Sequence, residues 1–444
     1  MLAGPFIYWF IVEPAASITT PHSMKKSVLS NWLLVGVFAS LCGLLVVLGF
    51  LSDETEDAGS SSMSRSFPTS AEPKEEAAEL FRQGMRYHDG DGLPKDLVKA
   101  FAFFRRSAEL GHAPGQAWLG YCYDNGEGVK RDMVKAIEWY RKGAEQGDPF
   151  AQYNLGDCLR SGDGVKQDLI EAFRCFRNSA EQANSDAQQA LGFCYELGQG
   201  VHKDLDQAFI WYEKAANNGE LVSMNYLAVF YERGWGVAKD PIKMAYWFKK
   251  AADAGEPFAQ NNYGNCLLAG SGVAKDPAIA VDWFLKSNAQ GNMCAPESLG
   301  RCYESGQGVL VDDSKAFSYY KTAAERGYLP GMIKLARCYA NGIGVAKDVS
   351  KAIECYKAAF RRGDYSANAA LAFYFRHGEG VARNEIEAFA YLSLAAADFP
   401  EAREELAKLG AALSADQKAA GQRRAKEMHS EVMAAKDAKP LEYR

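Results

Sequence analysis

A pair of glycines separated by one residue recurs at intervals of 36 residues along most of this 444-residue chain. No insertion or deletion interrupts the spacing. A fixed period of roughly 20–50 residues is the signature of repeat architectures, whose units bury their apolar faces only against their neighbours. The spacing therefore predicts a stack of nine equivalent units. Their first glycines are Gly90, Gly126, Gly162, Gly198, Gly234, Gly270, Gly306, Gly342 and Gly378.

The residues around each glycine pair predict a helix, a tight turn and a second helix. Two glycines permit positive φ, so the first helix can end and the chain can turn. Six residues after the first glycine comes an Asp, or Asn in the ninth copy, that can cap the second helix, as Asp132 does in the second copy. Small residues in the first helix, such as Gly120, allow helices to approach closely. We expect an all-α fold: an α/α solenoid superhelix of nine 36-residue helix-turn-helix repeats over residues 76–399.

The repeat pattern LG-x-x-Y-x-x-G-x-G-V-x-x-D-x-x-K-A-x-x-W-Y-x-K-A-A resembles the Sel1-like repeat family, which is related to the tetratricopeptide repeat. Residues 119–147, LGYCYDNGEGVKRDMVKAIEWYRKGAEQG, match it almost position for position. Two copies depart from the pattern, with Gln83 in place of leucine and Phe360 in place of alanine. The resemblance implies a scaffold or adaptor that binds protein or peptide partners on its concave surface.

Residues 400–436 follow the ninth repeat and are predicted to form two capping helices. Ser414 and Gln417 have the spacing of a capping box, which marks the start of the second helix. The charged side chains of this segment suit a polar terminal cap, which a solenoid needs to stay soluble.

An uncharged, apolar segment of 24 residues runs from Val28 to Leu51. As a helix it would rise about 36 Å, enough to cross a hydrocarbon core of roughly 30 Å. Lys25 and Lys26 precede it and acidic residues at 53–57 follow it, which favours a cytoplasmic N-terminus. We expect residues 28–51 to be a single-pass signal anchor in the inner (plasma) membrane, with the repeats facing the periplasm or outside. The alternative is secretion after signal cleavage.

Two further N-terminal segments are predicted not to fold. Residues 1–23 contain three prolines and no Lys or Arg, and Met24 resembles a more natural start. We expect them to be an over-extension of the reading frame or a short cytoplasmic segment. Residues 52–73 are rich in Ser, Gly, Pro and acidic residues, a composition that indicates a flexible linker.

Composition and motifs argue against nucleic-acid binding and catalysis. The net charge is −6 and the pI is about 5.7, whereas nucleic-acid-binding proteins carry a basic face. The six histidines are scattered, and the chain has no P-loop, dinucleotide fingerprint, G-x-S-x-G or H-E-x-x-H motif. Residues 89–92, DGDG, resemble the start of a calcium loop but lack its later ligands, so we interpret them as a repeat turn. We expect a non-enzymatic protein with no cofactor and no metal.

Most of the ten cysteines occupy equivalent positions in the repeat. Equivalent positions in neighbouring repeats should lie about 8–10 Å apart, whereas a disulfide needs Cα atoms within about 7 Å. We interpret these cysteines as small buried hydrophobic residues, with a disulfide or a metal site as alternatives. Six share one position, namely Cys122, Cys158, Cys194, Cys266, Cys302 and Cys338.

The candidate binding surface is the side of the first helix that faces away from the core. On a helical wheel Leu119 and Cys122 lie on the core side, whereas Ala117, Tyr121 and Asp124 lie opposite. We define two columns, from the equivalents of Ala117 in the first eight repeats and from the equivalents of Tyr121 in all nine. The Ala117 column is Phe81, Ala117, Tyr153, Gln189, Asn225, Asn261, Glu297 and Ile333. The Tyr121 column is Met85, Tyr121, Asp157, Phe193, Val229, Asn265, Arg301, Arg337 and Phe373.

The chemistry of these columns changes along the chain, from aromatic in repeats 2–4 to amide in repeats 5–6 and arginine in repeats 7–8. Asn side chains can bind a peptide backbone and arginines can bind a carboxylate. We expect an extended peptide with an acidic or C-terminal carboxylate end, although an ordinary solvated face is the alternative. The predicted partner-binding residues are Tyr121, Tyr153, Phe193, Asn225, Asn261, Asn265, Arg301 and Arg337.

Two functions fit these features. The first is a membrane-tethered interaction scaffold that binds peptide or protein partners. The alternative is a binder of cell-wall peptide or glycan that regulates envelope enzymes.

Overall fold

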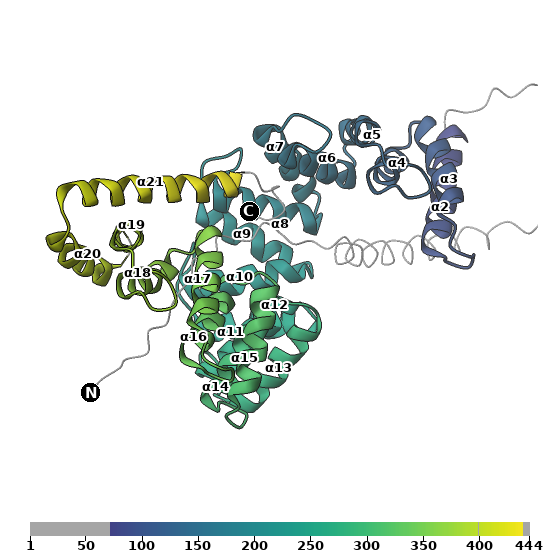
Figure 1. Cartoon of the computed structure of the whole chain (residues 1–444). Helices are drawn as coiled ribbons and strands as arrows, with labels where there is room; N and C mark the ends of the chain where they lie inside the picture. The colour runs from purple at the N-terminus through teal and green to yellow at the C-terminus, as the bar shows by residue number, and fades with distance from the viewer. Residues whose placement is uncertain (1–71, 398, 438–444) are drawn as a thin grey trace, which may run out of the picture. The chain divides into compact units, whose positions relative to one another are not determined.

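The described part of the chain consists of helices joined by short turns. The computed structural model describes residues 72–397 and 399–437, and these residues form twenty α-helices and one 3₁₀-helix without any β-strand (Figure 1). This confirms the predicted all-α solenoid fold. The predicted membrane segment at 28–51 lies outside the described residues. None of the helices that are described is both long enough and apolar enough to span a bilayer.

Each repeat is a hairpin of two helices. The first helices are α2 (Glu72–Asp89), α4 (Ala113–Asn125), α6 (Pro149–Ser161), α8 (Ser185–Leu197), α10 (Leu221–Arg233), α12 (Pro257–Ala269), α14 (Ala295–Ser305), α16 (Leu329–Asn341) and α18 (Asn368–His377). The second helices are α3 (Leu97–Glu109), α5 (Met133–Glu145), α7 (Leu169–Glu181), α9 (Leu205–Asn217), α11 (Pro241–Asp253), α13 (Pro277–Ala289), α15 (Asp313–Glu325), α17 (Val349–Arg361) and α19 (Glu385–Ala395). The 3₁₀-helix (Tyr365–Ala367) precedes α18.

Helix α2 begins inside the segment predicted to be a flexible linker. Its first residue is Glu72, whereas the sequence analysis extended the linker to residue 73. Pro73 stands in the first turn, where its fixed φ suits a helix and its missing N–H has no intrahelical partner to lose.

The described residues fall into two compact units. One comprises residues 72–239, from the first repeat to the first helix of the fifth. The other comprises residues 240–437 and contains α11, the last four repeats and the C-terminal helices.

The turn within each hairpin forms as predicted. In the second repeat Gly126 ends α4 in the left-handed region, with φ 70°, and its N–H donates to the carbonyl of Cys122. The side chain of Asp132 then accepts a hydrogen bond from the backbone N–H of Lys135 and caps α5. In addition, the Asp132 N–H donates to the Tyr123 carbonyl over 2.9 Å, which ties the start of α5 to the end of α4.

The second glycine of each pair serves a different purpose. Gly128 also has positive φ, but an added Cβ there would lie only 2.1 Å from the carbonyl oxygen of Leu97 in the preceding repeat. The corresponding distance is 1.9 Å for Gly200 and 1.8 Å for Gly272. This glycine therefore allows one turn to sit directly on the start of the previous second helix.

Within six of the nine hairpins, a glycine of the first helix packs on an aromatic ring of the second. A Cβ at Gly120 would come within 2.7 Å of the ring of Tyr140, which is fully buried. Gly192 and Tyr212 repeat this arrangement in the fourth hairpin. The small residue predicted in the first helix thus leaves space for the aromatic ring of the second helix.

The cysteines of the shared position are buried. None of the nine cysteines among the described residues forms a disulfide. Burial raises the pKa of Cys122 and of Cys194 to about 12, so these thiols stay protonated at neutral pH. Their environment is that of small apolar side chains in a packed core.

The seventh repeat has a shortened first helix. Helix α14 begins at Ala295, and the side chain of Asn292 accepts hydrogen bonds from the N–H groups of Cys294 and Ala295. Pro296 occupies the position that is Gln152 in the third repeat. Because proline is tolerated only in the first turn, the helix starts just before it.

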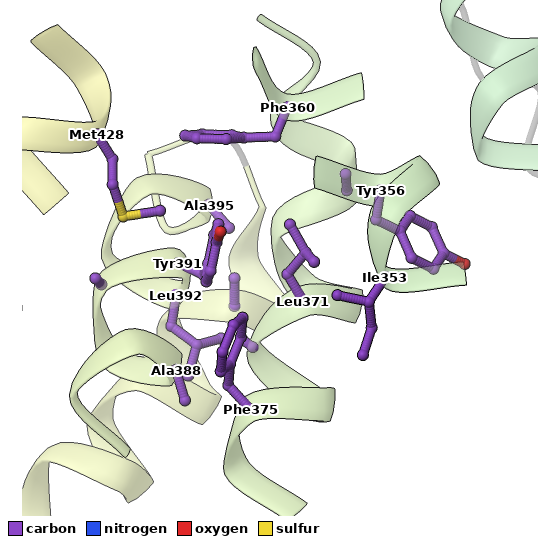
Figure 2. Close-up of a cluster of buried hydrophobic side chains, with 14 of the residues drawn as sticks. Ile353, Tyr356, Phe360, Leu371, Phe375, Ala388, Tyr391, Leu392, Ala395 and Met428 are labelled. Carbon is purple, nitrogen blue, oxygen red and sulfur yellow. The ribbon is translucent and has the colours of Figure 1, made fainter. Parts of the chain in front are cut away.

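Helices α20 (Pro400–Ala412) and α21 (Ala415–Asp437) follow the ninth repeat, close to the predicted bounds. Figure 2 shows Met428 of α21 beside Phe360 and Tyr391, where it completes the last apolar core. The capping box forms, because Ser414 N–H donates to Gln417 Oε1 and Gln417 N–H donates to Ser414 Oγ.

Candidate partner-binding surface

The two columns of the first helices differ in exposure. Ala117 is 0% exposed, and Tyr153 and Asn261 are 9% and 6% exposed. Residues of the Tyr121 column are half-buried or exposed in every repeat. The helical-wheel assignment is thus corrected for the Ala117 column, most of which is buried in the stack.

The physical reason lies in the number of neighbours of a first helix. A first helix contacts its own hairpin partner and also the helices of adjacent repeats. Less than half of its circumference is therefore exposed to solvent. At Ala117 the close neighbour is Gly143 of α5, where an added Cβ would lie 3.4 Å from the Ala117 nitrogen. Periodicity within one helix does not reveal such a contact.

Tyr153 and Asn261 are predicted site residues that stabilise the stack. The ring of Tyr153 packs on Phe176 with centroids 6.0 Å apart, and its burial raises the pKa of the phenol. The amide oxygen of Asn261 accepts a hydrogen bond of 3.0 Å from Ser298 Oγ in the next repeat. Neither side chain offers much surface to a partner.

Tyr121 belongs to an aromatic cluster on the unit of residues 72–239. Its ring centroid lies 5.3 Å from Trp118 and 5.8 Å from Phe150 of the following repeat. His88 from the preceding repeat lies 5.0 Å from Trp118. Trp118 and Phe150 were not predicted from the sequence, since neither position is consistently aromatic in the other repeats.

The remaining predicted residues are accessible to different degrees. Phe193, Asn225 and Asn265 are half-buried on α8, α10 and α12. Arg301 is exposed on α14, and Arg337 is half-buried on α16.

Each arginine is paired with a glutamate. Arg301 lies 3.8 Å from Glu297, one turn earlier in α14. Arg337 contacts Glu304 of the preceding repeat, and Glu304 also accepts a hydrogen bond of 2.7 Å from the Tyr320 hydroxyl. The arginines therefore lie in a network that already contains two carboxylates.

The described part of the chain contains no group of three or more His, Cys, Asp or Glu side chains placed to hold a metal ion. In the DGDG turn, Asp89 Oδ1 lies 2.7 Å from His88 Nδ1, and Gly90 and Gly92 both have positive φ. This segment has the geometry of the other repeat turns.

The family model of the Sel1 repeat matches nine consecutive segments of the sequence, which together cover more than half of the chain. The segments are residues 77–112, 113–148, 149–184, 185–220, 221–256, 257–292, 298–328, 329–364 and 366–398. The chain belongs to the Sel1 repeat family. Proteins built from Sel1 repeats are generally protein-interaction scaffolds and are typically not enzymes.

Solved Sel1 repeat structures resemble this chain. A Sel1 repeat protein from Oxalobacter formigenes is 29% identical, with 55% of this chain and 96% of that chain covered and a TM-score of 0.51. A protective antigen present in uropathogenic Escherichia coli strains, which displays an SLR fold, is 28% identical, with 83% and 97% covered and a TM-score of 0.46. No curated protein matches the sequence.

The family-model match also reflects the shortened first helix of the seventh Sel1 repeat. The matched segment there begins at residue 298, whereas the repeat before it ends at residue 292. The gap coincides with Pro296 and the delayed start of α14. This repeat contributes Arg301 to the candidate surface.

Proposed function

We propose that this protein is a membrane-tethered interaction scaffold that binds peptide or protein partners through the Tyr121 column of its Sel1 repeats. The observation that carries the proposal is the exposure of this column. Its side chains are accessible in every repeat, yet their chemistry changes from repeat to repeat, whereas the glycines, caps and buried aromatics recur. Packing therefore explains why the glycines, caps and buried aromatic residues recur. It does not fix the residue types of the Tyr121 column, so these residues can specify a partner.

Each unit supplies its own part of this surface. On residues 72–239 the column offers the accessible aromatic side chains Tyr121 and Phe193, with Trp118 and Phe150 beside Tyr121. On residues 240–437 the column offers Asn265, Arg301 and Arg337. Aromatic side chains supply large contact areas and arginines bind carboxylates, so the two parts fit different segments of a partner.

We place the repeats outside the cytoplasm, tethered by residues 28–51. The charge asymmetry across this segment supports the orientation, because Lys25 and Lys26 precede it and four acidic residues follow it. The proposed tether keeps the scaffold at the membrane surface.

Site-specific photo-crosslinking in cells tests the proposal. A photoreactive residue at Tyr121 or at Arg301 should capture a defined partner. Matched positions on exposed faces of second helices, Glu138 and Ser318, should capture none. Equal capture at all four positions would contradict a specific Tyr121-column surface. If the protein instead co-sediments with isolated cell-wall sacculi and captures no protein, the cell-wall binder would replace the scaffold.

A further inference from the structure

Lys334 on α16 is a half-buried lysine without an ionic partner. It makes no hydrogen bond or ion pair with any residue that the structure describes, and its ammonium lies 5.9 Å from the centroid of the Tyr320 ring. Burial and the positive charges of Arg337 and Arg301 lower the pKa of Lys334, whereas the carboxylates of Glu297 and Glu304 raise it. A partly buried charge is costly unless it is paired, and no carboxylate contacts the Lys334 ammonium directly.

The nearby carboxylates are already engaged. Glu304 accepts hydrogen bonds from Tyr320 and Arg337, and Glu297 is buried beside Arg301. Three cations thus share two carboxylates. The buried Nε of Arg337 also has no hydrogen-bond partner. Of the three cations, Lys334 is the one without a direct ion pair to a carboxylate.

The repeat architecture does not require these cations. In the second and third repeats, the positions of Glu304 and Arg337 are occupied by Asp124 and Asp157, and the position of Lys334 by Asn154. The helices stack there with the same hairpin geometry. The fold thus tolerates a positive or a negative charge at the Arg337 position. This position is therefore available for partner recognition.

An apolar turn follows α14, the helix that carries Arg301. Leu310 and Val311 in this turn are 90% and 63% exposed, and the position of Val311 is Lys, Arg or Gln in the other eight repeats. In the second repeat the equivalent of Val311 is Arg131, whose guanidinium donates to the Asp124 carbonyl over 2.7 Å. Val311 packs at the end of α14, since an added Cβ at Gly306 would lie 2.9 Å from it. Leu310 and Val311 thus form an exposed aliphatic turn directly after α14, the helix that carries Arg301.

We propose that Lys334, Arg301 and Arg337 form a carboxylate-recognition site, and that it binds an acidic segment of a partner protein with an aliphatic residue next to the acid. The proposal rests on the proposed function and assigns the chemistry of one part of its surface. Charge complementarity argues for a short acidic segment, because a chain with net charge −6 repels an extended polyanion. Lys334 supplies the unpaired charge, and Leu310 and Val311 contact the aliphatic side chain.

Fluorescence anisotropy with defined peptides on the full-length protein tests this site. The probe is a labelled ten-residue peptide of alternating Glu and Leu, compared with versions that carry Gln for Glu or Ser for Leu. We expect the Glu–Leu peptide to bind at least about tenfold more tightly than the Gln version, which is the loss of one charge-assisted hydrogen bond. Equal binding of the Glu and Gln peptides, or no binding of either, would overturn the proposal.

The decisive variant is Lys334→Met, which keeps an unbranched side chain one atom shorter and removes the charge. Binding of the Glu–Leu peptide should weaken by about tenfold. The variant should fold and melt like the parent protein, because it removes a charge that has no partner. The matched control is Lys321→Met on the exposed face of α15, which should leave binding unchanged. Equal affinities for the parent and Lys334→Met proteins would refute the role of Lys334.

Failure of this inference can be separated from failure of the scaffold function. If Tyr121 and Arg301 crosslink a partner whose binding does not change in Lys334→Met, the scaffold stands and the carboxylate site is wrong. If no position crosslinks a partner but the Glu–Leu peptide still binds through Lys334, the site stands and the scaffold is wrong.

Discussion

The phenol of Tyr212 in α9 donates a hydrogen bond of 2.8 Å to the carboxylate of Glu196 in α8, and both side chains are buried. The same pairing, 16 residues apart, joins Tyr140 to Asp124 and Tyr320 to Glu304. Where the aromatic residue is Phe176, the position 16 residues earlier holds Arg160 and no acid. In these repeats the hydroxyl and the carboxylate occur together because each satisfies the other.

Tyr212→Phe should destabilise the protein by about 1–3 kcal/mol, because Glu196 would remain buried without its donor. Urea unfolding followed by circular dichroism measures the change. Tyr195→Phe is the matched control, since the Tyr195 hydroxyl makes no side-chain hydrogen bond in the described structure, and it should change stability by less than about 0.5 kcal/mol. The double variant Tyr212→Phe/Glu196→Leu should recover most of the loss; if it is as unstable as Tyr212→Phe alone, the pairing is not the cause.

The cost of Tyr212→Phe should also depend on pH. Burial raises the pKa of Glu196 in the folded protein, whereas the hydrogen bond from Tyr212 lowers it. Removing the phenol raises that pKa further, and a carboxyl with a raised folded pKa loses stability as pH rises through it. The destabilisation should therefore be larger at pH 7 than near pH 4. A constant difference across this range would contradict the assignment.

An amide pair connects each of several first helices to the end of its own hairpin. Gln182 Nε2 donates to Gln152 Oε1 over 2.9 Å and to the Gly147 carbonyl over 3.0 Å. In the eighth repeat the equivalent residues are Met332 and Arg362, and Arg362 donates to the Gly327 carbonyl instead.

Gln152→Met should therefore cost about 1–2 kcal/mol, and the further change Gln182→Arg should offset part of it by reproducing the eighth repeat. Urea unfolding of the two single variants and the double variant gives the coupling energy. Strict additivity of the two changes would show that the amides do not interact.

His88 should make stability depend on pH near neutrality. Burial lowers its pKa, but hydrogen bonds to Asp89 and to Glu127 of the next repeat outweigh burial, so the pKa is raised overall. A raised histidine pKa contributes stability below the unfolded value of about 6.5 and loses it as pH rises through the folded pKa.

Thermal melts should show this loss above about pH 6.5, as the pH rises through the folded pKa of His88, in the parent protein and not in His88→Phe. An identical pH profile for both proteins would exclude His88 as its source.

The two positive-φ glycines Gly128 and Gly147 should differ in their tolerance of alanine. Nothing lies within 4 Å of a Cβ added at Gly147, so Gly147→Ala should cost only the backbone strain, roughly 1–2 kcal/mol. Gly128→Ala adds a clash with the Leu97 carbonyl, and should cost about 2–5 kcal/mol in total. Calorimetry of both variants measures the difference. Similar losses would mean that the second glycine serves only the turn.

The proposed orientation predicts an active alkaline phosphatase fusion at the C-terminus in bacteria, because that enzyme folds outside the cytoplasm. The motivation is the charge asymmetry around residues 28–51. A well-expressed but inactive fusion would contradict the orientation. A mature N-terminus after residue 51 would instead support cleavage and release.

The sequence by itself determined the repeat, its two helices, its caps and its turn, because each depends on residues only a few positions apart. Asp132 caps α5 through a backbone group three residues away, and Gly126 ends α4 through the carbonyl four residues before it. These short-range contacts recur in every repeat, so the sequence of one repeat is enough to predict them.

Only the tertiary structure decided which side chains a partner can reach. The burial of Ala117, Tyr153 and Asn261 results from helices that are distant in sequence, as in the contact of Asn261 with Ser298, 37 residues later. The unpaired charge of Lys334 likewise depends on Glu304 being held by Tyr320 and Arg337. Exposure and pairing depend on contacts between repeats, which a helical wheel for one helix does not include.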